Sequence, residues 1–170
     1  MKIVTDCAAD MPAEELEALD ITQVPLFIQF PEGEVNSADL TPDEFYNRLE
    51  AMRPAIPTTA LPSEGIFASI YRKLAETSKQ ILSLHISSGL SGTFNSARMG
   101  GEQVKETEVT VVDTLTLSGG ERFQVLAAAW AARACWSLNS ILERLVQIRA
   151  NTEVIYTLET LEYLARGGRI

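Results

Sequence analysis

The sequence predicts a three-layer α/β protein in which helices cover both faces of a mainly parallel sheet. Strand-like and helix-like stretches alternate along the 170 residues. The strand-like stretches at residues 81–86 and 109–112 are mostly apolar, which is typical of strands buried on both faces. Residues that cap helices stand directly before several of the helical stretches.

The N-terminal stretches predict a strand, a helix and a second strand-like run. Residues 2–5 form a short β-branched strand, and residues 11–18 form a helix with Asp10 placed to cap it. Residues 21–30 are apolar and rich in strand-forming side chains, but Pro25 interrupts them, because proline cannot donate to a sheet ladder.

Two capped helices follow, separated by an extended loop. Thr41, Pro42 and Glu44 combine an N-cap, a proline at the first helical position and the glutamate of a capping box, so a helix runs from here to about Met52. Ser63 caps a second helix that extends to residue 78. Three prolines make the stretch between the helices an extended loop: Pro54, Pro57 and Pro62.

The second half continues the alternation. Ser137 is placed to cap one of its helices. The expected strands are residues 81–86, 109–112 and 154–158, and the expected helices are residues 93–104, 119–135, 138–150 and 160–165.

Composition excludes several classes of protein. The hydrophobic content of 46% and charged content of 22% are those of a globular protein, and the net charge of -9 argues against binding to nucleic acid or to an anionic membrane surface. No run reaches the ~18 apolar residues that a membrane span needs. Cys7 and Cys135 are far apart, form no CxxC pair and fit reduced thiols in a cytoplasmic protein.

The segment Ser87–Ala97 carries the strongest functional signal. It places a Gly- and Ser-rich turn between an apolar strand and a helix, and this arrangement builds anion sites in α/β proteins. Glycine lets the backbone approach a ligand closely, while free amides and hydroxyls hold a carboxylate or phosphate. An ordinary turn whose serines only cap the helix is the alternative.

Catalytic interpretations are weaker. Ser91 resembles the nucleophile of a hydrolase, but the single histidine, His85, precedes it inside a strand and reads as a packed side chain. Asp6 and Asp113 follow strands and offer a Mg²⁺ site, or they cap the following turns. There is no G-x-G-x-x-G after the first strand and no P-loop.

Hydroxyl and apolar side chains instead gather at the expected strand ends. Such a polar point at the mouth of an apolar cleft fits an amphipathic ligand.

Five segments jointly resemble the N-terminal domain of the DegV family of fatty-acid-binding proteins. They span the chain in the family's order. The segments are Ile3–Asp10, Thr59–Ser63, Ser87–Ala97, Val112–Ser118 and Thr160–Ile170, which ends in Gly-Gly-Arg-Ile.

This resemblance implies a carrier that binds a long-chain fatty acid such as palmitate and performs no catalysis. It implies that Thr59 and Ser91 hold the carboxylate, with the Gly92 amide added, and that no cofactor or metal is needed. Some family members present the acyl chain to a fatty acid kinase, and the family places the docking of that kinase at the position of Arg169. We expect further pocket residues at Asp6, Cys7, Ser63, Ser88, Thr93 and Ser118.

The chain departs from the family pattern at three points. Cys7 stands where a serine is usual, and Ala60 and Leu61 stand where serine and glutamine are usual. We also expect that the chain lacks the family's second domain. We therefore expect a first domain at residues 1–165, a linker beginning at 166–170, weak lipid retention and a homodimer formed through the exposed cleft. The alternatives are a Mg²⁺-dependent phosphotransfer domain that uses Asp6 or Asp113, and an interaction domain whose cleft takes a protein helix.

Overall fold

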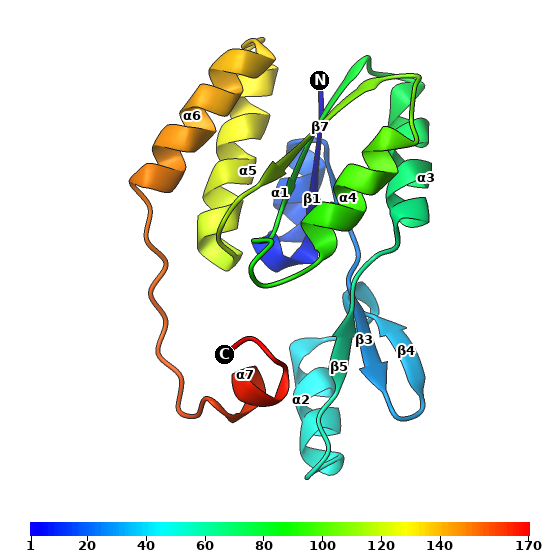
Figure 1. Ribbon diagram of the computed structural model, residues 1–170, viewed down its shortest axis with the longest axis vertical. Coiled ribbons are helices and arrows are strands. Elements are labelled where there is room, and N and C mark those ends of the chain that lie inside the picture. The colour runs from blue at the N-terminus through cyan, green and yellow to red at the C-terminus, as the bar shows by residue number, and fades with distance from the viewer.

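The computed structural model describes residues 1–170 and consists of two lobes (Figure 1). The larger lobe contains a parallel sheet of four strands in the order β2-β1-β6-β7. Its strands are β1 (Lys2–Asp6), β2 (Ile21–Val24), β6 (Gln80–His85) and β7 (Glu108–Asp113). The predicted parallel sheet is therefore confirmed, and all three of its pairings are parallel.

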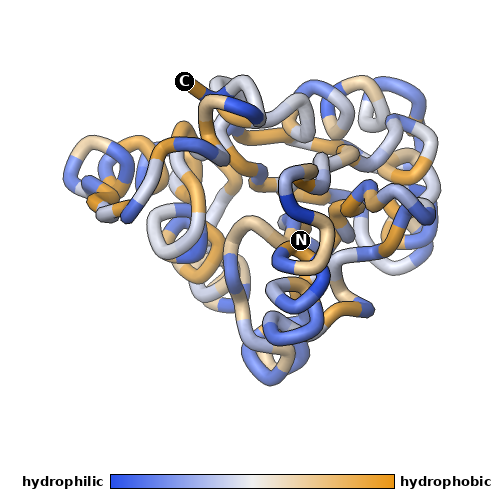
Figure 2. The backbone as a smooth tube through the Cα atoms, turned by 90° about the horizontal axis from the view of Figure 1, so that it is seen from below, coloured by the Kyte–Doolittle hydropathy of each residue, from blue (hydrophilic) through white to orange (hydrophobic).

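Helices cover both faces of this sheet, as the sequence predicts. The short helix η1 (Cys7–Ala9), α1 (Ala13–Ala18), α5 (Ser118–Arg133) and α6 (Leu138–Ala150) lie on one face, with α3 (Glu64–Ala75) and α4 (Thr93–Glu102) on the other. Side chains of adjacent residues in a strand point to opposite faces of the sheet. Ile3 packs into the core with α5, and Val4 packs into the core with α3. Hydrophobic stretches accordingly gather on the central strands (Figure 2).

The smaller lobe contains a second, antiparallel sheet that the sequence analysis missed. Its strand order is β4-β3-β5. Pro25 lies where the chain leaves the parallel sheet, so the expected run at residues 21–30 becomes two strands in different sheets. This lobe consists of β3 (Phe27–Phe30), β4 (Gly33–Asn36), the short helix η2 (Ser37–Asp39), α2 (Pro42–Ala51), β5 (Thr58–Ala60) and α7 (Glu162–Arg166).

Helix starts follow the predicted caps with one exception. The capping box of Thr41 and Glu44 is present, and Ser63 and Ser137 cap α3 and α6. The prediction for Asp10 was wrong, because the helix begins only at Ala13, after Pro12. Asp10 instead ends η1 in a left-handed conformation, with φ of 50°.

The predicted strand at residues 154–158 was also wrong. The chain between α6 and α7 is extended but pairs with no strand, because it leaves the parallel sheet and crosses alone to the smaller lobe (Figure 1). The final helix ends at Arg166, so the expected boundary after residue 165 falls at its last turn and stays a prediction. No helix has the length and apolarity needed to span a membrane.

Candidate functional site

The loops that follow β1, β6 and β7 emerge at one edge of the parallel sheet, the edge that faces the smaller lobe (Figure 1). Carboxyl ends of parallel strands meet at a common edge, where open α/β sheets bind ligands. The sequence analysis placed most of its candidate residues in these loops.

The loop from Ser87 to Thr93 is held by its own hydrogen bonds. The amides of Leu90 and Ser91 donate to the Ser87 carbonyl, at 2.9 and 3.1 Å. Ser91 Oγ lies 2.8 Å from Thr93 Oγ1 and accepts from the Thr93 amide at 3.3 Å. Ser91 is therefore fixed at the start of α4 and is half-buried.

Three amides at this helix start have no partner within the chain: those of Gly92, Phe94 and Asn95. Such groups are the unpaired donors that every helix N-terminus leaves, and they attract negative charge. Together with the Ser91 hydroxyl they form a neutral set of donors suited to a carboxylate.

Leu61 joins this loop to the smaller lobe. A Cβ added to Gly92 would lie 2.9 Å from Leu61 Cδ2, so only glycine allows this close approach without a shift of Leu61. Thr59 stands two residues earlier on β5, where it is exposed. The structure thus brings together the two segments that were expected to share the carboxylate.

Arg169 lies beside Thr59. Its Nη2 donates to Thr59 Oγ1 at 2.9 Å, and Arg166 fixes the preceding helix by donating to the Pro54 carbonyl at 2.7 Å. Sequence reasoning assigned Arg169 only to partner docking and missed this contact, since nothing in the sequence pairs positions so far apart.

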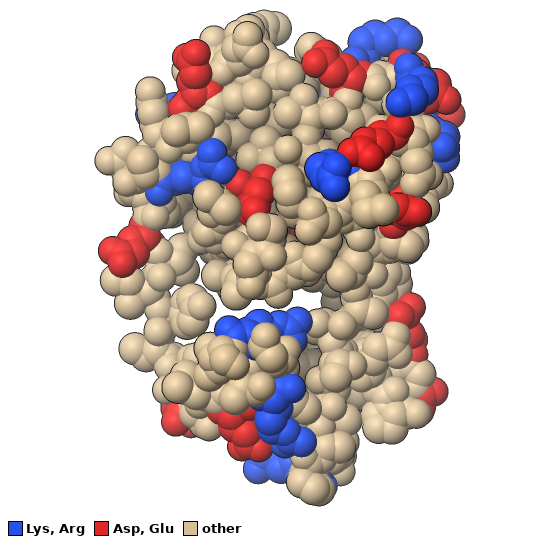
Figure 3. Space-filling model, viewed as in Figure 1, with Lys and Arg blue, Asp and Glu red and all other residues tan.

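An opening separates the two lobes beside this site. In the space-filling view it passes through the molecule between the sheet edge and α7, and basic side chains line its lower edge (Figure 3). The extended segment between α6 and α7 bounds the opening on its outer side (Figure 1).

Asp6 is the center of a buried hydrogen-bond chain. Its carboxylate accepts from the Ala8 and Ile86 amides and lies 2.9 Å from His85 Nδ1. His85 Nε2 is 2.7 Å from Ser83 Oγ, which accepts from the Tyr71 hydroxyl at 2.8 Å. His85 is thus the packed side chain that the sequence predicts, turned away from any partnership with Ser91.

The contacts of Asp6 and Asp113 weigh against the phosphotransfer alternative, in which one of these carboxylates binds Mg²⁺. The Asp6 side chain is fully buried, and the Asp113 carboxylate accepts from the Ser88 and Leu115 amides. No group of three or more His, Cys, Asp or Glu side chains is arranged to hold a metal ion.

Of the remaining expected pocket residues, Thr93 lies beside Ser91, and the others make separate contacts. Ser63 caps α3, the Ser88 amide binds Asp113, and Thr93 is buried against Ser91. The Ser118 hydroxyl donates to Asp10 at 2.6 Å, and Cys7 Sγ lies 3.3 Å from Ser37 Oγ.

Cys7 lines a pocket of about 570 Å³ at the junction of the lobes, together with Asp10 and Ser37. Burial raises the pKa of the Cys7 thiol, so the thiol form dominates there. Cys7 is therefore a weakly reactive thiol in contact with a hydroxyl.

Glu121 is a buried carboxyl group in the first turn of α5, beside β1. Burial, reinforced by the nearby charge of Asp6, raises the pKa of Glu121 to about 10. One of its oxygens accepts from the Thr5 hydroxyl at 3.3 Å, and the other has no partner. Glu121 is therefore a neutral acid at physiological pH.

These features define a two-lobed α/β protein with a hydroxyl and amide site at the junction of its lobes. The chain belongs to the DegV family: the family profile described as "Uncharacterised protein, DegV family" matches residues 1–170. This membership confirms the resemblance that the sequence motifs indicate.

Relatives at the sequence level are identical to the chain at a third or more of the aligned positions. A DegV domain-containing protein of Lactococcus lactis, YejH, is 37% identical over 170 residues, covering all of this chain and 60% of that protein. One from Deinococcus radiodurans is 39% identical over 170 residues, covering 99% of this chain and 59% of that protein. The chain thus spans about 60% of the length of such relatives.

Solved structures of the family share this fold. A fatty-acid-binding DegV protein from Thermus thermophilus superposes with a TM-score of 0.92 at 35% identity, over 98% of this chain and 59% of that one. A Thermotoga maritima protein described as having a fatty acid binding function has a TM-score of 0.86 at 31% identity, over 99% and 63% of the two chains.

Proposed function

We propose that this chain binds the carboxylate of a long-chain fatty acid such as palmitate through the Ser91 hydroxyl, the Thr59 hydroxyl and the Gly92 amide. The observation that carries the proposal is the contact of Leu61 with Gly92, which brings the segments of Thr59 and Ser91 together. The fatty acids bound by the Thermus and Thermotoga relatives support it.

The chemistry of the donors agrees with this ligand. Desolvating a carboxylate is costly, so a site needs several good donors, and the unpaired amides at the start of α4 add to the two hydroxyls. Arg169, bonded to Thr59, adds a positive charge within reach of the same point. Burial of the acyl tail then contributes about 0.8 kcal/mol per methylene.

The proposed role is that of a carrier and not of an enzyme. In this role residues 1–165 hold the ligand and residues 166–170 lead into a linker, while Arg169 contributes to the docking of a fatty acid kinase in the cytoplasm. The site needs neither cofactor nor metal. The proposal includes a homodimer formed through the exposed cleft.

The test is the amount of copurified fatty acid, measured by lipid extraction and mass spectrometry. The chain and a form extended to the length of its relatives are compared with Thr59→Val and Ser91→Ala. Each substitution should weaken binding by roughly 1–3 kcal/mol, and Ser69→Ala, on an exposed position of α3, should leave it unchanged. Absence of lipid from both lengths of the wild-type protein would refute the proposal.

A further inference from the structure

A second pocket, of about 470 Å³, lies between the loop after β6, the loop after β7, the start of α5 and the segment that follows α6. Its walls include Ser87, Thr116, Gln124, Arg149 and Val154. Neither Thr59 nor Ser91 lines it, so it is distinct from the proposed fatty-acid site. Its size falls within the range of about 300–1,000 Å³ typical of pockets for small molecules.

Gln124 gives this pocket an unsatisfied acceptor. The side chain is only 1% exposed, and its Oε1 has no hydrogen-bond partner. The amide orientation is fixed, because Nε2 donates to the Thr114 carbonyl at 3.0 Å and to the Gly120 carbonyl at 3.4 Å. A buried acceptor without a donor is costly, and a ligand hydroxyl would satisfy it.

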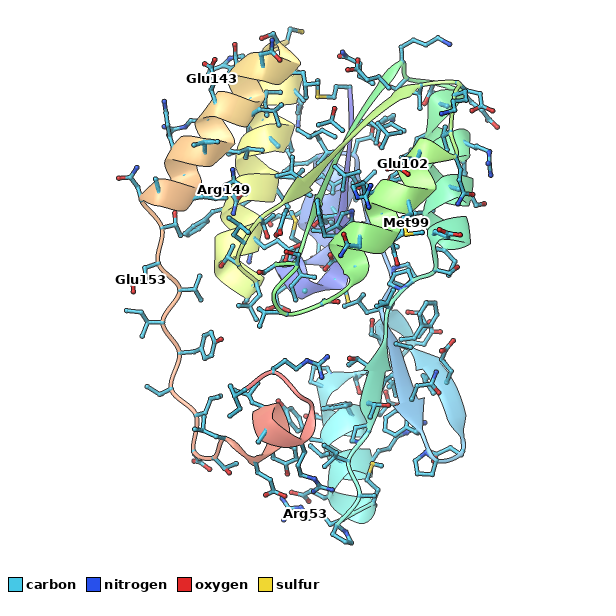
Figure 4. The ribbon with its side chains drawn as sticks, in the orientation of Figure 1. Arg53, Met99, Glu102, Glu143, Arg149 and Glu153 are labelled. Carbon is cyan, nitrogen blue, oxygen red and sulfur yellow. The ribbon has the colours of Figure 1, made fainter.

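Arg149 gives the same pocket an unpaired cation. Its Nη1 donates to the Asp113 carbonyl at 2.7 Å, and the residue forms no ion pair. The edge formed by Nε and Nη2 stays free, and this edge can bind a carboxylate with two parallel hydrogen bonds. The Arg149 side chain extends from the last turn of α6 to the end of β7, while the Glu153 side chain points away from the molecule (Figure 4).

The segment after α6 closes the pocket on its outer side. A Cβ added to Gly120 would lie 2.6 Å from both Val154 Cγ2 and Thr116 Oγ1, so this segment packs directly on the first turn of α5. Apolar wall is supplied by Leu90, Leu117, Val154 and Tyr156. The pocket therefore combines one cation, one buried acceptor and an apolar wall, and the rest of its lining is polar and includes Glu153.

We propose that this pocket binds a small hydroxycarboxylic acid with an apolar body, whose carboxylate pairs with Arg149 and whose hydroxyl donates to Gln124 Oε1. A carboxylate alone would leave the acceptor unsatisfied, and an alcohol alone would leave the guanidinium edge unpaired. The two groups together distinguish a hydroxy acid from a simple acid of the same shape.

Isothermal titration calorimetry of the full chain tests this assignment with three probes, each beside a partner that lacks the hydroxyl. The pairs are lactate and propanoate, mandelate and phenylacetate, and 3-phenyllactate and 3-phenylpropanoate. We expect at least one hydroxy acid to bind about tenfold more tightly than its partner, the factor that one good hydrogen bond supplies. Equal binding within every pair, or no saturable binding by any probe, would overturn the proposal.

Variants locate the site. Arg149→Gln should weaken the hydroxy acid about tenfold or more, whereas Arg144→Gln, on the exposed face of the same helix, should have no effect. Gln124→Met should remove the preference for the hydroxy acid and leave binding of its partner unchanged, a result that loss of folding could not produce. Unchanged binding of the hydroxy acid in both Arg149→Gln and Gln124→Met would place the ligand elsewhere and overturn the proposal. Thr59→Val should leave binding of the hydroxy acid unchanged, which separates this site from the proposed fatty-acid site.

Discussion

Arg169 Nη2 donates a hydrogen bond to Thr59 Oγ1 across 2.9 Å, although 110 positions separate the two residues. The contact joins the last residues of the chain to β5, an edge strand of the smaller lobe's sheet. It places a guanidinium beside a hydroxyl that we propose binds a carboxylate, so the basic group can stabilise the same negative charge.

Replacing Arg169 by Gln should therefore weaken binding of palmitate about tenfold, because a charge-assisted interaction is lost while the hydroxyl remains. Displacement of a fluorescent fatty acid measures this change. Arg98→Gln is the control, since Arg98 pairs only with Glu102 on the exposed face of α4. An unchanged affinity in Arg169→Gln would show that the guanidinium bonds to Thr59 without contributing to fatty-acid binding.

Gly92→Ala should disturb the site more than the fold. The added Cβ meets only the end of the Leu61 side chain, at 2.9 Å, and the backbone of Gly92 is unstrained at φ of -75°. We expect Leu61 to shift, unfolding stability to fall by less than about 1 kcal/mol, and fatty-acid affinity to fall. The double variant Gly92→Ala with Leu61→Ala should recover the affinity, and failure to recover would separate Leu61 from the effect.

Gly100→Ala should destabilise the larger lobe by about 2–4 kcal/mol. Its Cβ would lie 2.6 Å from Phe67 Cβ and 2.7 Å from the Glu64 carbonyl oxygen, so α3 and α4 would have to separate. Urea unfolding measures the loss. Gly119→Ala is the matched control, because nothing lies within 4 Å of its added Cβ and alanine favors helix formation.

Glu121→Gln should change how stability depends on pH. In the folded protein the pKa of Glu121 is raised to about 10, well above its ordinary value of 4.5, because the side chain is buried. Between these pH values the folded state binds more protons than the unfolded state, so the native protein loses stability as pH rises from about 4.5 toward 10.

A glutamine mimics the neutral acid and removes this loss. The slope of unfolding free energy against pH should become less negative in Glu121→Gln, by up to about 1.4 kcal/mol per pH unit. Denaturant titrations from pH 5 to 9 supply the slopes, with the exposed Glu143→Gln as control. Parallel slopes in wild type and Glu121→Gln would mean that Glu121 is ionised in the native state.

Local signals were read correctly from the sequence. The capping box at Thr41 needs only Glu44 three residues later, and the buried strand that contains Leu82 and Leu84 is visible from its apolar character. Pro25 also marks a real break, since it separates strands of two different sheets.

Non-local pairings could not be predicted in the same way. The strand at Thr58–Ala60 is only three residues long and exists because it pairs with Phe27–Gln29, about thirty positions earlier. The stretch at 154–158 has strand-forming residues but no partner, so propensity alone gave a wrong prediction there. The contacts of Arg169 and Leu61 likewise depend on how the lobes meet.

The backbone passes between the lobes three times. Two passages, near Pro25 and near Pro62, run side by side, and the third is the lone segment between α6 and α7. A lobe attached in this way can pivot about the paired passages only as far as the third allows. Eleven residues separate Ala150 from Glu162, and at full extension they reach about 36–40 Å. This length sets the largest separation of the two lobes that is possible before α6 or α7 must unwind.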